Sequence, residues 1–107
     1  MEDIIWLEDD MSMKNLISFK DVSVDYIEIY PGAIESNVIH HEIDEWLYIL
    51  EGELLVFRGD EKILLNESEH IFIPKGTKHG SINRCGKMVK MLSVCSPKFT
   101  VEDMNKI

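Results

Sequence analysis

The sequence predicts an all-β domain, built as an antiparallel sandwich or barrel. Short apolar and β-branched runs alternate with turn residues from about residue 22 to residue 94, and no apolar pattern at helical spacing persists there for three turns. Strands at such close and regular intervals are typical of sandwiches and barrels. The chain has 107 residues, of which 45% are hydrophobic, so it has the size of one domain and can bury a core.

Each expected strand ends at residues that favour turns. Gly59 lies between two apolar runs as in a hairpin, because glycine can adopt a positive φ without steric cost. The tail differs, since Thr100 followed by Glu102 and Asp103 resembles a helix N-cap with acid in the first turn, which predicts a short terminal helix. The strands are expected over residues 22–30, 45–50, 53–58, 61–65, 69–73, 79–83 and 87–94.

The first 20 residues form an extension with few strand signals. They include Trp6 and Phe19, and their apolar surface is too large for a free tail. We therefore expect a single domain over residues 1–107, in which this extension packs on the barrel of residues 22–95 or on a second subunit.

The charge of the chain excludes several classes of function. Asp and Glu total 20 against 11 Lys and Arg, a net charge of −9, and no basic stripe gathers on any segment, so we expect no binding to nucleic acid or to anionic membranes. No stretch reaches the roughly 18 apolar residues of a membrane helix, and the acidic N-terminus differs from a secretory signal. We expect a cytoplasmic protein whose Cys85 and Cys95 stay reduced.

Two runs of the sequence carry residues that can bind a metal. In the first, four residues separate His40 from Glu45, and six separate Glu45 from Gly52. The second is P-K-G-T-K-H-G-S-I-N over residues 74–83, and it contains His79. Two imidazoles and one carboxylate on facing strands are ligands of the kind found in non-haem iron and related divalent sites.

These spacings resemble the two motifs of the cupin superfamily. The first motif is glycine, five residues, H-x-H, three or four residues, glutamate, six residues and glycine. The second is glycine, five residues, P-x-G, two residues, histidine, three residues and asparagine. Val38 stands at the first histidine position and Ser68 at the opening glycine of the second motif. The fixed positions that match are Gly32, His40, Glu45, Gly52, Pro74, Gly76, His79 and Asn83.

The resemblance implies an antiparallel jelly-roll β-barrel around a divalent transition metal, which is iron, manganese, zinc, nickel or copper. His40, Glu45 and His79 are the expected ligands, and Val38 removes a fourth. We favour His40 because this alignment keeps five residues between Gly32 and the first-histidine position, which Val38 occupies. His41 is the alternative, since the family also allows three residues before the glutamate.

Strand alternation predicts which other residues face the metal. Residues two and four positions beyond Glu45 and His79 point the same way as these ligands, which gives a mostly apolar cavity with a few polar groups. The expected ligand is a small molecule with oxygen donors. The residues expected to line the cavity are Val38, Leu47, Ile49, Ser81 and Asn83.

The function is open between two main classes, because cupins resemble one another across many activities. One is an enzyme that acts on a small oxygen-rich metabolite by dioxygenase-, isomerase- or lyase-like chemistry. The other is a non-catalytic barrel that binds a small ligand or sugar and has a weakened or lost metal site. A structural dimer with an empty barrel is a third reading. In each case we expect a homodimer.

Overall fold

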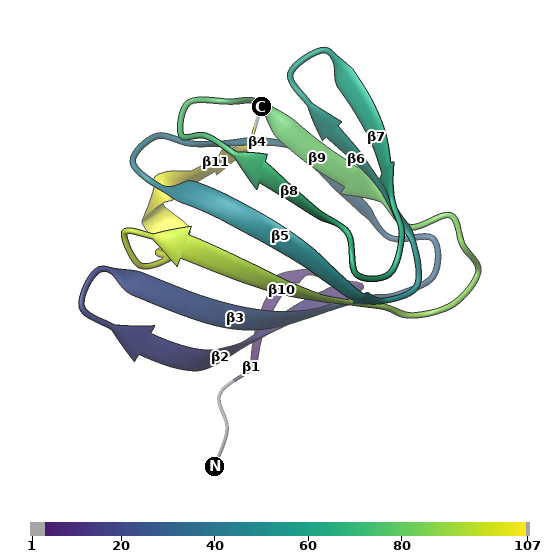
Figure 1. The fold of residues 1–107 in the computed structure, drawn as a ribbon, viewed down its shortest axis with the longest axis horizontal. Helices are drawn as coiled ribbons and strands as arrows, with labels where there is room; N and C mark the ends of the chain where they lie inside the picture. Colours follow the sequence, from purple (N-terminus) through teal and green to yellow (C-terminus); the bar gives the residue numbers. More distant parts are fainter. Residues whose placement is uncertain (1–3, 107) are drawn as a thin grey trace.

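The computed structural model describes residues 4–106, which form two antiparallel sheets that face each other and close into a jelly-roll barrel (Figure 1). The first sheet has six strands in the order β1 (Ile4–Glu8), β2 (Met11–Phe19), β3 (Val22–Ile29), β10 (Val89–Ser96), β5 (Asp44–Glu51) and β8 (His70–Ile73). The second has five strands in the order β11 (Met104–Lys106), β4 (Ile34–His40), β9 (His79–Ile82), β6 (Leu54–Arg58) and β7 (Glu61–Leu65). The expected jelly roll is confirmed.

The strands expected between residues 22 and 94 are all present, with ends that differ by at most two residues. The hairpin at Gly59 is one of them, and its register pairs Arg58 with Glu61 across the turn. The alternation that predicted β5 is also visible, because its residues are buried and exposed in turn from Glu45 to Leu50. Turn residues and period-two burial therefore placed these strands correctly.

Four further strands were not among those expected, namely β1, β2, β4 and β11. The extension before residue 20 supplies β1 and β2, and β2 pairs with β3 along most of its length. The sequence of β4 lacks clear alternation because three of its first four residues are exposed. Their strand structure comes from pairing with neighbours more than from local pattern.

The expected terminal helix is a single 3₁₀ turn, Val101–Asp103, in which the Asp103 N–H donates to the Thr100 carbonyl at 3.3 Å. The chain then continues as β11, which pairs with β4 from His40 to Val38. The free edge of β4 offers unpaired backbone groups, so the tail completes the second sheet instead of extending a helix. The signal thus located the start of a helical turn, but the turn is shorter than the helix it predicted.

The hydrophobic core fills the space between the sheets. Its side chains come from the inward positions of both sheets and of the N-terminal extension. Burial of such side chains from water is the main force that holds the two layers together. Its members are Met11, Met13, Ile27, Ile29, Ala33, Leu47, Ile49, Leu54, Val56, Leu65, Ile71, Ile73, Val89 and Met91.

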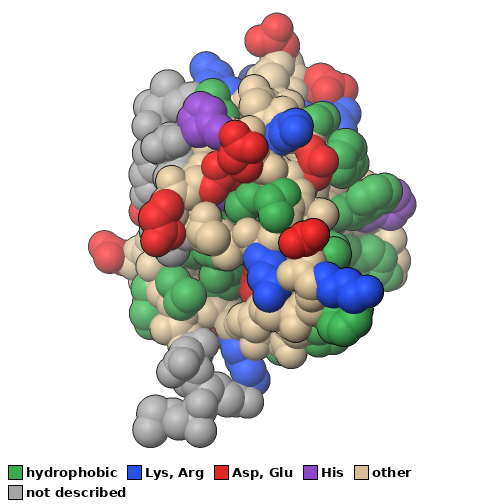
Figure 2. Space-filling view, turned by 90° about the vertical axis from the view of Figure 1, so that its left-hand side faces the viewer, with side chains coloured by type: hydrophobic (Ala, Val, Ile, Leu, Met, Phe, Trp, Pro, Cys, Tyr) green, Lys and Arg blue, Asp and Glu red, His purple; other side chains and the backbone are tan. Residues whose placement is uncertain are grey.

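The outer surface carries the charge of the protein. Figure 2 shows acidic and basic side chains interspersed on one face, with hydrophobic side chains gathered toward the right-hand edge. The exposed aromatic residues Trp46, Tyr48 and Phe72 lie on the outward positions of β5 and β8. Within residues 4–106, no helix has the length and apolarity needed to cross a membrane.

Candidate metal centre

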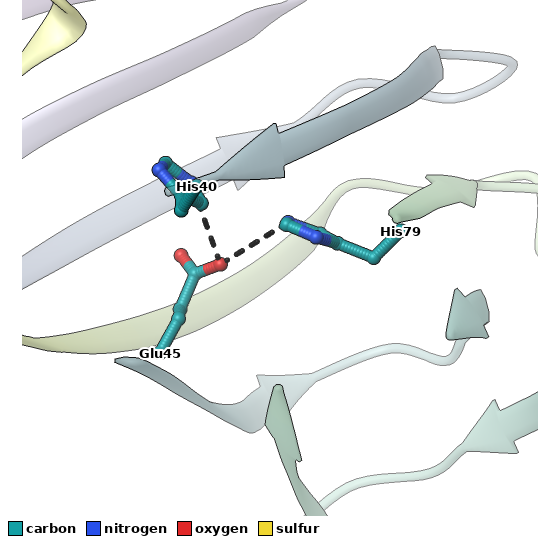
Figure 3. A group of neighbouring side chains, drawn as sticks. All are labelled: His40, Glu45 and His79. Atoms are coloured by element: carbon teal, nitrogen blue, oxygen red, sulfur yellow. Dashed lines mark ion pairs between the residues drawn. The ribbon is translucent and has the colours of Figure 1, made fainter. Parts of the chain in front are cut away.

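The structure brings His40, Glu45 and His79 together inside the barrel (Figure 3). Glu45 Oε1 lies 3.4 Å from His79 Nε2 and 3.9 Å from His40 Nε2. One ligand atom from each residue lies within 4.8 Å of the others, and all three side chains are buried. His40 and His79 belong to the five-stranded sheet and Glu45 to the six-stranded sheet, so the cluster joins the two layers.

The turn before β9 fixes the relative position of these strands. The Gly76 N–H donates to the His40 carbonyl at 2.7 Å, and the Lys75 N–H donates to Asp44 Oδ1 at 2.8 Å. Gly76 has a φ of 80°, a left-handed conformation that glycine adopts without strain. The P-x-G turn is thus bonded to the end of β4 and the start of β5, and it delivers His79 beside both.

Second contacts orient two of the three side chains. His79 Nδ1 donates to the Thr77 carbonyl at 3.0 Å, which leaves Nε2 facing the cluster. The Ser93 hydroxyl donates to Glu45 Oε2 at 2.6 Å, which leaves Oε1 facing both imidazoles. Ligands held through their outer atoms in this way are typical of metal sites.

The outer nitrogen of His40 is the exception. Its Nδ1 is buried and has no hydrogen-bond partner within residues 4–106, and Asp103 Oδ2 lies 3.7 Å away. The 3₁₀ turn that carries Asp103 is anchored because the Glu42 N–H donates to this carboxylate at 3.1 Å. A carboxylate behind a metal-binding imidazole is a recurrent arrangement, so the donor set and its surroundings fit a divalent transition metal.

The ionisation of the cluster follows from its burial and its neighbours. Burial lowers the pKa of His40 below its usual value, although the charge of Glu45 opposes this. Burial acts the same way on His79, but its interaction with the Glu45 carboxylate outweighs burial and raises the pKa. Burial opposes the charge on Glu45, yet His79, His40 and Ser93 together hold the pKa of this carboxyl below its usual value. In the metal-free site these shifts favour the charged forms of His79 and Glu45 and the neutral form of His40.

The cluster borders a cavity of about 30 Å³, with room for about two water molecules. Apolar side chains form most of its wall, and Glu35, Ser81 and Ser93 are the polar residues besides the cluster. Phe99 from the tail also lines the cavity, and its ring lies edge-to-face with the His40 ring, with 6.0 Å between the ring centroids. The apolar lining residues are Leu7, Met11, Met13, Ile27, Leu47, Met91 and Phe99.

The structure places the other expected site residues differently. Leu47 and Ser81 line the cavity, whereas Ile49 belongs to the hydrophobic core away from it. Val38 is fully buried opposite His79 in the β4–β9 pair and does not line the cavity. The alternative ligand His41 is exposed and lies outside the cluster.

Asn83 is not a lining residue, although the alternation after His79 predicted it. The strand β9 ends at Ile82, and the Asn83 amide turns toward the backbone of two neighbouring segments. Its Nδ2 donates to the carbonyls of Ile29, Tyr30 and Lys87, and its Oδ1 accepts from the Cys85 N–H. The asparagine of the second motif therefore has a structural role in this chain.

Sequence reasoning missed Glu35, Ser93, Phe99 and Asp103 near the centre. Ser93 had a usable signal, because it lies on the inward positions of β10 opposite Leu47. Phe99 and Asp103 come from the tail, whose return to β4 is a long-range contact that no local pattern reveals.

We predict that Ser93→Ala weakens metal binding about tenfold, since loss of an outer hydrogen bond to a ligand typically costs 10- to 100-fold in affinity. The variant leaves Glu45 Oε2 without its donor and frees the carboxylate to rotate. Calorimetric titration with Co²⁺ measures the change. Ser96→Ala is the control, because Ser96 is exposed on the same strand. Equal affinities in Ser93→Ala and the parent protein would show that the bond does not position the ligand.

Comparison with known proteins agrees with this architecture. A family model described as "Cupin domain" matches residues 25–95. The xanthan biosynthesis protein XanB of Xanthomonas campestris pv. campestris (strain B100) is 34% identical over 77 residues, which cover 72% of this chain and 16% of that protein. The tetracenomycin polyketide synthase protein TcmJ of Streptomyces glaucescens is 31% identical over 72 residues, 67% of this chain and 48% of that protein.

This chain thus spans less than half the length of either relative. Among solved structures, KdgF from Halomonas sp. superimposes with a TM-score of 0.84 at 21% identity, covering 91% of this chain and 87% of that one. At this identity the likeness establishes a shared fold. The family model covers most of the barrel, including both motifs and all three clustered residues, and the chain therefore belongs to the cupin domain family.

Proposed function

We propose that this cupin binds a divalent transition metal through His40, Glu45 and His79 and uses it to hold a small oxygen-rich metabolite. The observation that carries the proposal is the convergence of three ligand atoms within 4.8 Å of one another, from three strands of two sheets. A bound metal supplies a Lewis acid that polarises a ligand oxygen, or, as iron, a redox centre for dioxygenase-like chemistry.

The chain's own residues prepare this site in three ways. The two imidazoles and Glu45 offer one inward atom each, which leaves open positions for a ligand. Ser93 and the Thr77 carbonyl hold Glu45 and His79 in place. The apolar wall limits the water around the centre, which strengthens electrostatic interactions there.

The metal content of purified protein tests this proposal. Protein prepared without added metal is compared with His79→Ala and with His41→Ala, whose side chain is exposed outside the cluster. We expect about one equivalent of transition metal in the parent and in His41→Ala, and a trace in His79→Ala, because two ligands rarely retain a metal. The same trace in all three proteins would refute the metal site.

The second candidate is a barrel that binds a sugar or other small ligand without metal. Two observations favour it. The relative XanB is described as a xanthan biosynthesis protein, and Val38 replaces a possible metal ligand at the first histidine position of the motif. A hexose is several times larger than the cavity, so it would require Phe99 and its neighbours to move. A rise in the melting temperature of chelator-treated protein with hexose phosphate, and none with metal, would favour this candidate.

A further inference from the structure

The outer side of the six-stranded sheet is apolar across five of its strands. Hydrophobic side chains gather along the right-hand edge of Figure 2, which is the front of the view in Figure 1, where β5, β10 and β3 cross. The register aligns outward side chains in rows, and one row contains, in order across the sheet, Phe72, Trp46, Val94, Val24 and Ile17. Five strands spaced by about 4.8 Å make this row about 19 Å wide. The outward apolar residues, called here the apolar face, are Ile17, Phe19, Val22, Val24, Tyr26, Trp46, Tyr48, Leu50, Phe72, Leu92 and Val94.

The N-terminal extension contributes one end of the apolar face. Val22 and Val24 alternate with buried residues of β3 and therefore point outward. A register shift within β2 places Ile17 opposite Val24 and Phe19 opposite Val22. Because directly opposed residues point to the same side of a sheet, Ile17 and Phe19 also point outward. The extension thus belongs to the core at the start of β2 and to the apolar face at its end.

The area of the apolar face matches what one subunit contributes to a stable interface. Its seven most exposed residues are between 37% and 65% exposed, and they present about 650 Å² if each whole residue has about 200 Å². Monomeric proteins rarely expose a contiguous apolar patch of more than a few hundred Å². A standard interface buries about 800 Å² on each partner, and the four half-buried members and the polar rim supply the difference.

Two aromatic donors of the apolar face are already bonded within the chain. Trp46 Nε1 donates to His70 Nδ1 at 2.9 Å, and the Tyr26 hydroxyl donates to Glu28 Oε2 at 2.9 Å. Contact with an apolar partner therefore leaves neither donor unsatisfied, which would otherwise carry a desolvation cost. Neither donor is free for the hydroxyl groups of a sugar. The aromatic residues thus favour packing against apolar protein surface.

The distribution of charge favours a second copy of the chain as the partner. The net charge is −9, so two copies repel one another over most of their surface. At one end of the apolar face, Lys90 lies in register between Glu28 and Glu51, and its Nζ is 3.4 Å from Glu51 Oε2. The members of the apolar face carry no charge themselves. Two copies can therefore meet here without burying an unpaired charge, whereas a basic partner would be drawn to the acidic surface elsewhere.

We propose that two copies of this chain associate through the apolar face as a two-fold symmetric dimer, with their six-stranded sheets packed against each other. Both copies offer the same patch, as a two-fold interface requires. Apolar side chains of two such sheets interdigitate at a separation of about 10 Å. The inference goes beyond the proposed metal site and does not depend on it, because the apolar face lies on the outer side of the strands that carry Glu45 and Ser93 inward.

Sedimentation velocity of chelator-treated protein, measured as a function of protein concentration, tests the dimer. Trp46→Glu and Tyr48→Glu each place a carboxylate within the apolar face, and we expect either one to raise the dimer dissociation constant about 100-fold or more. Both residues are exposed in the single chain, so the fold should be retained, which thermal unfolding verifies. Leu64→Glu is the matched control, because Leu64 is 49% exposed on β7 of the other sheet.

A parent dimer that persists in Leu64→Glu and dissociates in Trp46→Glu and Tyr48→Glu supports the proposal. A parent protein that stays monomeric at every concentration overturns it. A dimer that both charged variants of the apolar face retain, or that Leu64→Glu alone disrupts, overturns it as well. Because the chelator removes any bound metal, each of these results is independent of the proposed metal site.

Discussion

Between pH 6.5 and pH 5.5, the affinity of the protein for Co²⁺ is expected to fall about tenfold. A metal can bind His79 only after displacing its proton, and the pKa of this ring is raised above its usual 6.5 by the Glu45 carboxylate. The pKa is lowered by burial at His40 and by the neighbours His79, His40 and Ser93 at Glu45, which favours the unprotonated forms of these two ligands. Metal binding is therefore expected to release the proton of His79, and each pH unit below the pKa of this ring costs a factor of ten.

Calorimetric titrations at pH 6 in two buffers of different ionisation enthalpy measure this proton directly. Release of one proton per Co²⁺ is the expected result. A pH-independent affinity across the interval, or release of no proton, would show that His79 is not protonated in the metal-free site.

The metal-free protein provides a control with an opposite dependence. The raised pKa of His79 contributes stability that is full below 6.5 and is lost as the pH rises through the folded-state pKa. The lowered pKa of Glu45 contributes stability that is present above 4.5 and is lost as the pH falls through its own folded-state pKa. The His79–Glu45 pair should thus stabilise chelator-treated protein mainly between pH 4.5 and pH 6.5. Over the same range, the affinity for metal declines as the pH falls.

Asn83→Asp is expected to destabilise the fold by about 3 kcal/mol or more, which corresponds to a fall in melting temperature of roughly 15 °C. The Asn83 side chain is fully buried and its Nδ2 donates to three backbone carbonyls. An aspartate has the same shape but no donor, so it places a carboxylate against three carbonyl oxygens with no water to separate them.

Thermal and urea unfolding of the two proteins measure this difference. Asn66→Asp makes the same chemical change at an exposed position and should alter stability by no more than about 0.5 kcal/mol. If Asn83→Asp lost no more stability than Asn66→Asp, the buried amide would not be needed to hold the end of β3 against the segment before β10.

The strands that sequence analysis predicted correctly are those with a strong local signal. The hairpin around Gly59 and the alternation of β5 are examples, because turn chemistry and period-two burial are properties of a few adjacent residues. The unexpected strand β4 carries the bulge that disturbs its alternation, and β11 forms only because a distant strand offers an edge. Neither cause is visible in a short window of sequence.

The site shows the same division. His40, Glu45 and His79 were found from their spacing, which reflects the fixed geometry of the strands and turns that carry them. Glu35 was missed because counting by twos from Val38 assigns it to the outer face, and only the bulge reverses this. Asn83 was misplaced for the converse reason, since the strand ends one residue earlier than the alternation required.

Because its three ligands come from both sheets, a bound ion would link the two sheets of the barrel. Separation of the two sheets and release of the ion then become a single event. The free energy of unfolding would then depend on the concentration of free metal in the surroundings as well as on the packing of the chain.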